Sequence, residues 1–102
     1  MQVGHVDLEP LSQDLLTDWL ETTDVWRVSG TEIVGDFTFK NFSQALGFIV
    51  QVGILAERQD HHPRIENTYT RVTIAMNTHD AGNKITRRDT KLAELIEQIN
   101  IY

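Results

Sequence analysis

At 102 residues, the chain is long enough for one domain with a hydrophobic core but leaves little volume for a deep cavity, so a ligand site is expected in a cleft at an edge. Its formal net charge of −6 argues against binding to nucleic-acid phosphates. The absence of cysteine excludes disulfide bonds, thiolate zinc sites and a cysteine nucleophile, and it fits a reducing compartment.

The start of the chain has no basic region and no apolar core, so it is not typical of a signal peptide. No apolar run approaches the roughly 18 residues that a membrane-spanning helix needs. Neither repeats nor a linker interrupt the sequence. We therefore expect a single cytoplasmic domain over residues 1–102, with neither nucleic acid nor a membrane as a partner.

The first predicted helix begins at the N-cap Ser12, whose hydroxyl can accept a hydrogen bond from the first turn, and it runs to about Glu21. Two strands follow, the first around Trp26 and the second over residues 33–39, with a turn at residues 29–30 between them. In the second strand apolar residues alternate with exposed ones, which is typical of a strand with one buried face.

Asn41 is the expected cap of the longest helix, over residues 42–60. Helical spacing gives this helix one apolar stripe, formed by Phe42, Ala45, Leu46, Ile49, Val52, Gly53 and Ala56. Four further apolar side chains lie outside the stripe, namely Phe48, Val50, Ile54 and Leu55. A helix that is apolar nearly all round needs two partners, so we predict that one face covers a sheet and the other contacts another subunit.

The second half of the chain repeats the two-strand pattern. Pro63 ends the long helix, and a short strand around Ile65 precedes a longer one over residues 69–77. After a loop at residues 80–84, Thr86 is the expected N-cap of the last helix. Because the links between consecutive strands are short, we predict an α+β fold with a four-stranded antiparallel sheet and helices packed on one face, in the order helix-strand-strand-helix-strand-strand-helix.

Three of the four histidines lie in this second half, and they are the first candidates for chemistry. Histidine is the side chain whose ordinary pKa is nearest neutral pH, so His61, His62 and His79 could donate and accept protons within one turnover. Glu57 stands four residues before His61, so we expect both on one helix face, with the carboxylate stabilising a charged imidazole. If the last strand runs back beside the helix end, all three imidazoles meet. His5 is given no role.

Other interpretations of the same residues remain open. Adjacent histidines at a helix end also fit a polar C-terminal cap, and imidazoles with a carboxylate could hold zinc. Asp89 stands three residues after Thr86, which is the spacing of a capping box, so it could serve the helix, the site or both. Trp26 and Tyr69 are interpreted as packing residues of the core or a sheet face.

The spacing of these groups resembles the signature of the pterin-4a-carbinolamine dehydratases. The resemblance covers roughly the last three-quarters of the chain, and its residues in register are Glu57, His61, His62, Pro63, Tyr69, His79 and Asp89. Two departures stand out: Gly35 occupies a position where the family often has arginine, and residues 81–84 replace a loop that commonly has paired glycines.

The resemblance implies the family's fold and reaction. Members dehydrate a 4a-hydroxytetrahydropterin (the 4a-carbinolamine) to the quinonoid dihydropterin and water, which recycles the tetrahydrobiopterin cofactor of aromatic amino-acid hydroxylases. They need no metal and no cofactor besides the pterin substrate. Subunits join their sheets edge to edge, and long helices can pack dimers into tetramers, so a homodimer or homotetramer is expected.

Site residues follow from the resemblance position by position. His61 and His79 would act as acid and base and His62 would hold the pterin, while Glu57 and Asp89 would position the imidazoles. The expected pterin-binding residues are Asp60, Pro63, Asn77 and Thr78. The alternative function is a non-catalytic dimerisation or assembly-cofactor module of the same fold.

Overall fold

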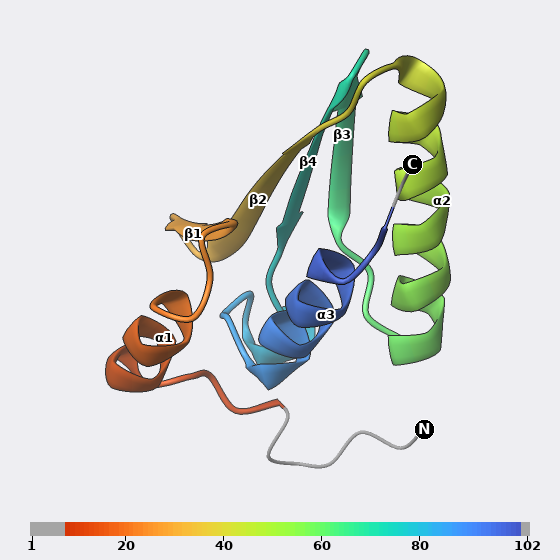
Figure 1. Ribbon diagram of the computed structural model, residues 1–102. Coiled ribbons are helices and arrows are strands. Elements are labelled where there is room, and N and C mark those ends of the chain that lie inside the picture. Colours follow the sequence, from red (N-terminus) through yellow and green to blue (C-terminus); the bar gives the residue numbers. More distant parts are fainter. Residues whose placement is uncertain (1–7, 101–102) are drawn as a thin grey trace.

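The computed structural model describes residues 8–100 and has the predicted order of helices and strands (Figure 1). A short 3-10 helix, η2, lies where the sequence predicts a loop. The elements are α1 (Gln13–Leu20), β1 (Trp26–Ser29), β2 (Glu32–Thr38), α2 (Phe42–Gln59), β3 (Arg64–Thr68), β4 (Arg71–Met76), η2 (His79–Ala81) and α3 (Arg87–Glu97).

The three helices begin at the predicted caps. The Ser12 hydroxyl accepts a hydrogen bond from the Leu15 N–H, and the Asn41 side chain accepts one from the Gln44 N–H. At α3 the Thr86 side chain and the Asp89 carboxylate form a complete capping box. Each cap satisfies N–H groups that have no partner inside the helix, which is why short polar side chains define these starts.

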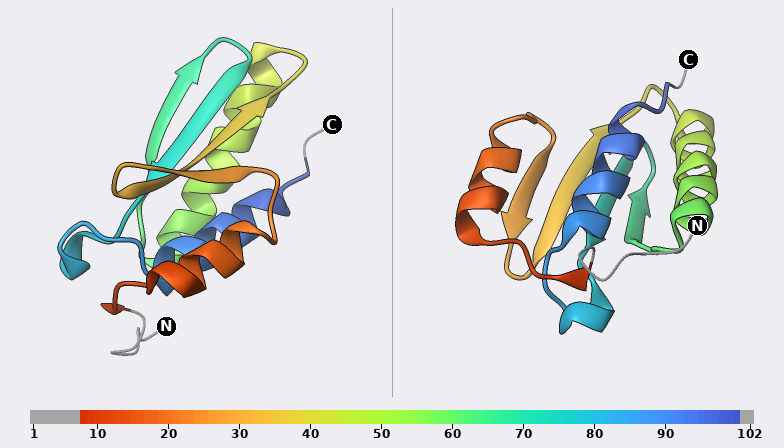
Figure 2. Two further views of the ribbon diagram at one scale, coloured as in Figure 1. Left: turned by 90° about the vertical axis from the view of Figure 1, so that its left-hand side faces the viewer. Right: turned by 90° about the horizontal axis from the view of Figure 1, so that it is seen from below.

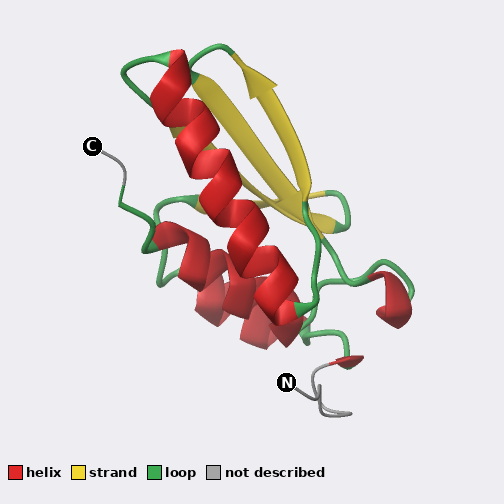
Figure 3. Ribbon diagram, turned by 90° about the vertical axis from the view of Figure 1, so that its right-hand side faces the viewer, coloured by secondary structure: helices red, strands yellow, loops and turns green. Residues whose placement is uncertain are grey.

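The four strands form one antiparallel sheet in the order β1-β2-β4-β3. Helices α2 and α3 cover the same face of this sheet, and among residues 8–100 no helix covers the opposite face (Figures 1 and 3). The predicted α+β layer is therefore confirmed. Within residues 8–100, no helix combines the length and the apolar character that a membrane crossing requires.

The core lies between the sheet and the two helices. Strand residues that alternate along β4 face it, and Val72, Ile74 and Met76 are at most 2% exposed, as predicted. From α3 the core receives Leu92, Ala93 and Ile96. Burying such side chains stabilises the fold by roughly 1.5–3 kcal/mol each.

The rotation of α2 about its axis differs from the prediction. Phe48, which the prediction placed outside the stripe, is 2% exposed. Its ring packs against the rings of Phe37 and Phe39, with distances between ring centroids of 4.7 and 4.9 Å. Phe42 and Leu46, placed inside the stripe, are 45% and 43% exposed. Because residues 45–56 contain no charge, the sequence offered no polar face to orient the helix, and packing against the sheet decided it.

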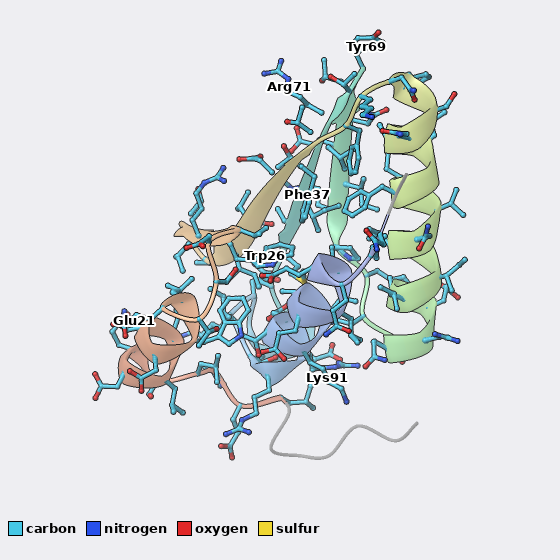
Figure 4. The ribbon with its side chains drawn as sticks, in the orientation of Figure 1. Glu21, Trp26, Phe37, Tyr69, Arg71 and Lys91 are labelled. Carbon is cyan, nitrogen blue, oxygen red and sulfur yellow. The ribbon has the colours of Figure 1, made fainter. Side chains whose placement is uncertain are left out.

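Two aromatic residues predicted as packing groups have different surroundings (Figure 4). Trp26 is 4% exposed and meets Phe37 edge to face at 5.9 Å, so its packing role is confirmed. Tyr69 lies in the β3–β4 turn with φ 53°, is 67% exposed and stacks on Phe42 instead of entering the core or a sheet face. Because Tyr69 lies in the turn with a positive φ, its side chain does not follow the alternation of side chains that a strand would give it.

Gly35 has a packing reason of its own. It is paired directly with Trp26 across β1 and β2, and a Cβ added to it would lie 3.0 Å from the indole ring. In this chain an arginine at position 35 would collide with the tryptophan. The departure from the family pattern therefore matches the way Trp26 fills the core.

Candidate active site

Four segments meet at one end of the molecule and form a cleft of about 240 Å³. They are the C-terminal end of α2, the residues after β4, η2 and the first turn of α3 (Figure 1). The cleft is lined by Asp60, His61, His62, Asn77, Thr78, His79, Asp80 and Arg88. All three candidate imidazoles therefore reach one cavity, although they lie 18 residues apart in the chain at most.

The end of α2 separates the two adjacent histidines from the helix. Asp60 is the C-cap, with φ 49° and ψ 45°, and the His61 N–H donates to the Ala56 carbonyl at 3.0 Å. This left-handed turn takes His61 out of helical register, so the expected pairing with Glu57 is wrong. Glu57 instead places Oε1 2.6 Å from Nε2 of His62, and both side chains are exposed.

His61 is held by a buried carboxylate that comes from α3. Its Nε2 lies 2.5 Å from Oδ1 of Asp89, and the two residues are 7% and 0% exposed. The other oxygen, Oδ2, accepts hydrogen bonds from the Thr78 hydroxyl at 2.8 Å and the Thr86 N–H at 2.9 Å. An ionised carboxylate only accepts, so Nε2 of His61 carries a hydrogen and Nδ1 is the nitrogen left for chemistry.

Thr78 supports this carboxylate from behind. Its hydroxyl lies 2.6 Å from the Thr86 hydroxyl, and its backbone N–H donates to the Lys84 carbonyl. Its own carbonyl accepts from the N–H groups of Ala81 and Asn83. A buried charge is tolerated only when it is hydrogen-bonded, and the two threonines supply part of what Asp89 needs.

His79 reaches the cleft from η2, an element separate from the end of α2 that carries the other two histidines. It is the first residue of η2, its side chain is exposed, and its Nδ1 lies 3.2 Å from Oδ1 of Asn83. Thus each imidazole has one nitrogen engaged by an oxygen outside the cleft, from Asp89, Glu57 or Asn83. Such contacts orient an imidazole and select its tautomer.

The sequence interpretation missed one cleft residue, Arg88. Arg88, half-buried, donates from Nη2 to the Asp60 carbonyl at 3.0 Å and so ties the start of α3 to the end of α2. Asp80 lines the cleft beside His79. The available signal for Arg88 was its position directly before Asp89, in the first turn of a helix that begins at the site.

The structure does not bring every expected residue into the cleft. Pro63 lines a separate apolar hollow of about 580 Å³ between α2 and β3. His62 lines both this hollow and the cleft. Glu57 and Asp89 lie behind the imidazoles instead of lining the cleft. In the part of the chain that the structure describes, no three His, Cys, Asp or Glu side chains are arranged to hold one metal ion.

The comparisons with known proteins agree with one another. Residues 9–99 match the family model of pterin 4 alpha carbinolamine dehydratase. A protein of Prochlorococcus marinus (strain NATL2A) that carries the name of this family is 38% identical over 89 residues, which is 87% of this chain and 93% of that protein. One of Nitrobacter hamburgensis, named likewise, is 40% identical over 89% of this chain and 91% of its own length.

The fold is also shared with a solved structure. The crystal structure of a transcriptional coactivator/pterin dehydratase from Brucella melitensis superposes with a TM-score of 0.81 at 36% identity, covering 87% of this chain and 96% of that one. Sequence and structure therefore lead to the same group of proteins, and the chain belongs to the pterin-4a-carbinolamine dehydratase family.

Proposed function

We propose that the chain dehydrates a 4a-hydroxytetrahydropterin to the quinonoid dihydropterin and water by histidine acid–base catalysis. The observation that carries this proposal is the meeting of His61, His62 and His79 in one cleft. Membership of the family supports the substrate class. On this proposal the substrate is the product of an aromatic amino-acid hydroxylase, and the reaction returns its tetrahydrobiopterin cofactor for recycling.

The reaction needs one proton delivered and one removed. The 4a-hydroxyl leaves as water once it gains a proton, and loss of the N5 proton completes the new carbon–nitrogen double bond. An imidazolium can give the first proton while a neutral imidazole takes the second. We assign these roles to Nδ1 of His61 and Nε2 of His79, the nitrogens opposite the contacts to Asp89 and Asn83.

The remaining groups of the cleft bind and orient. His62, held by Glu57, is assigned to the pterin ring, and Asp60, Asn77 and Arg88 offer polar contacts around it. The hydroxyl and backbone groups of Thr78 are already bonded within the protein, so its contribution is to hold Asp89 and shape the wall. Binding in a fixed orientation places the 4a carbon between acid and base.

The decisive experiment follows the dehydration of enzymatically generated 4a-hydroxytetrahydropterin by ultraviolet absorbance. His61→Ala and His79→Ala are each expected to lower kcat by roughly 10²–10⁴-fold, the usual contribution of a positioned acid or base. His5→Ala, at the one histidine outside the described residues, is the matched control and should keep the wild-type rate. Wild-type rates in both cleft variants would refute the mechanism.

A second role is favoured by the exposed face of α2. Four apolar side chains that recur every four residues form an exposed stripe along the helix, which differs from the predicted stripe. They are Phe42, Leu46, Val50 and Ile54, with exposed fractions of 45%, 43%, 62% and 53%. Contiguous exposed apolar surface of this kind marks a contact site. We propose that this stripe joins copies of the chain into a homo-oligomer.

The non-catalytic alternative uses the same stripe. The solved relative is described both as a transcriptional coactivator and as a pterin dehydratase, which is a statement about that protein. If the purified, folded chain does not accelerate dehydration, a dimerisation or assembly-cofactor role becomes the better proposal. The rate assay above therefore separates the two functions.

A further inference from the structure

The loop after His79 is closed tightly enough to hold a side chain against the imidazole. The Thr78 carbonyl accepts hydrogen bonds from the N–H groups of Ala81 and Asn83, and the Thr78 N–H donates one to the Lys84 carbonyl at 2.9 Å. The N–H of Gly82 donates to the His79 carbonyl at 3.0 Å. These four bonds fix the backbone of residue 83 relative to the histidine.

Asn83 occupies a backbone conformation that normally favours glycine. Its φ is 60°, in the left-handed region that few residues other than glycine, asparagine and aspartate adopt readily. An asparagine there keeps the turn and adds an amide that glycine lacks. The amide reaches back four residues and places Oδ1 3.2 Å from Nδ1 of His79.

This contact favours one tautomer of His79. With Oδ1 of the Asn83 amide turned toward the ring, the amide can only accept, so the arrangement favours a hydrogen on Nδ1 of His79 and leaves Nε2 for a substrate. His61 and His62 have the opposite arrangement, since their Nε2 atoms are engaged by carboxylates. The histidines after α2 and the histidine of η2 therefore leave different ring nitrogens free.

We propose that Asn83 is a positioning residue for His79, which sets the tautomer and ring orientation that the reaction requires. This inference rests on the proposed dehydration. Asn83 does not line the cleft and does not touch the reacting atoms; it acts through the imidazole.

Asn83→Gly is the sharpest test, because glycine adopts the same positive φ without strain and removes only the amide. The tautomer of His79 is measured by nitrogen-15 NMR at a pH where the imidazoles are neutral. We expect the Nδ1–H form to lose population and kcat to fall roughly tenfold with little change in KM, part of what a positioned acid or base contributes. An unchanged tautomer would overturn the proposal.

Two further variants separate positioning from loop structure. Asn83→Asp retains an acceptor at Nδ1, so it should restore the Nδ1–H form and move the pH–rate profile to higher pH, because a carboxylate stabilises the imidazolium. The matched control is Lys84→Ala, at an exposed neighbour whose contribution to the loop is its carbonyl. Equal losses of Nδ1–H form in Lys84→Ala, or failure of Asn83→Asp to restore it, would contradict the proposal.

The outcomes also distinguish this inference from the proposed function. If the wild-type chain shows no dehydration, the function is wrong, while the NMR measurement still decides whether Asn83 controls the tautomer of His79. If the wild-type chain is active and Asn83→Gly matches it in rate and tautomer, the function stands and the positioning role is refuted.

Discussion

At the scale of single residues, the buried carboxylate of Asp89 links the start of α3 to His61 in the candidate site. It completes the capping box of α3 and also contacts His61, so the two readings of this residue, as a cap and as a contact of the site, describe one side chain. A capping residue is usually at the surface, whereas this one is fully buried. Asp89 is buried because it lies between the start of α3 and His61, which also contacts it.

Replacing Asp89 by asparagine should be costly. Three donors surround the carboxylate, from His61, Thr78 and Thr86, so an amide must turn its NH₂ group toward at least one of them. We expect a loss of about 1–3 kcal/mol in the free energy of unfolding. We also expect kcat to fall by roughly 10²-fold, because His61 loses its orienting partner.

Urea unfolding and the dehydration assay check both effects of Asp89→Asn. The matched control is Asp14→Asn, an exposed acidic residue in the first turn of α1. An active, equally stable Asp89→Asn protein would show that the network around His61 is dispensable.

Gly35 gives a second prediction at this scale. Because an added Cβ would lie 3.0 Å from the rigid ring of Trp26, Gly35→Ala should destabilise the fold by about 1–3 kcal/mol, the usual cost of overpacking. Gly53→Ala is the matched control: nothing lies within 4 Å of its added Cβ, and alanine in a helix interior should stabilise by about 0.5–1 kcal/mol. Equal unfolding midpoints for the two variants would contradict the packing argument.

At the scale of elements, the open face of the sheet is tied together by polar side chains. Asp36 on β2 accepts from the Thr73 hydroxyl of β4 at 2.8 Å and from Arg27 of β1 at 2.6 Å. The hydrogen bond from Thr73, and then that from Arg27, lower the pKa of Asp36 below its ordinary 3.8. One carboxylate thereby connects three strands on the face that no helix covers.

The sign of the pH effect follows from that lowered pKa. The unfolded chain binds a proton at Asp36 more tightly than the folded chain does. The ionised Asp36 therefore stabilises the fold at pH values above its pKa in the unfolded chain, and this stabilisation is lost as the pH falls through its pKa in the folded chain. Asp36→Asn should therefore lose less stability than the wild type between about pH 6 and about pH 3. Both side chains of the Arg27 pair are more than half exposed, so the difference will be small.

Urea midpoints of both proteins at the two pH values test this. Asp18→Asn, at an exposed position on α1, serves as the control and should track the wild type. Identical pH dependence in Asp36→Asn and wild type would show that the polar contacts across the sheet do not couple to folding.

At the scale of the whole molecule, the candidate cleft and the exposed apolar stripe of α2 lie on different parts of the fold. The cleft lies at the end of the fold where α2, η2 and α3 come together, and the apolar stripe runs along α2. Figure 2 shows α2 extending away from that end. No residue of the stripe lines the cleft. A change in the middle of the stripe should therefore alter assembly without altering the arrangement of the histidines.

Light scattering can test this separation. Ile54→Glu should lower the solution mass while leaving the fold intact, because the side chain is 53% exposed and a charge disrupts an apolar contact. Leu15→Glu, at an exposed apolar residue of α1, is the control. An unchanged mass for Ile54→Glu would count against the proposed contact.

The apolar pattern placed Phe48 outside the predicted stripe, but the structure places it in the core. Since its ring is buried against Phe37 and Phe39, Phe48→Ala should destabilise each chain by about 3–5 kcal/mol, and any loss of assembly would follow from unfolding. The comparison of Ile54 with Phe48 thus distinguishes the surface of α2 from its core face.

Features that depend on near neighbours could be determined from the sequence alone. The caps at Ser12, Asn41 and Thr86, the alternation along β4 and the antiparallel pairing within the hairpins β1–β2 and β3–β4 all follow from residues that are close in the chain. The three histidines could also be selected, because their residue types and spacing carry the signal before any geometry is known.

Only the tertiary structure decided which groups meet. Because of the left-handed turn at Asp60, Glu57 contacts His62 and not His61. The packing of α3 places Asp89, 28 positions further along the chain, against His61. The rotation of α2 was equally undetermined, since a segment apolar on every side has no preferred face until a sheet covers one. Contacts between distant residues depend on the packing of whole elements, and local patterns do not encode that packing.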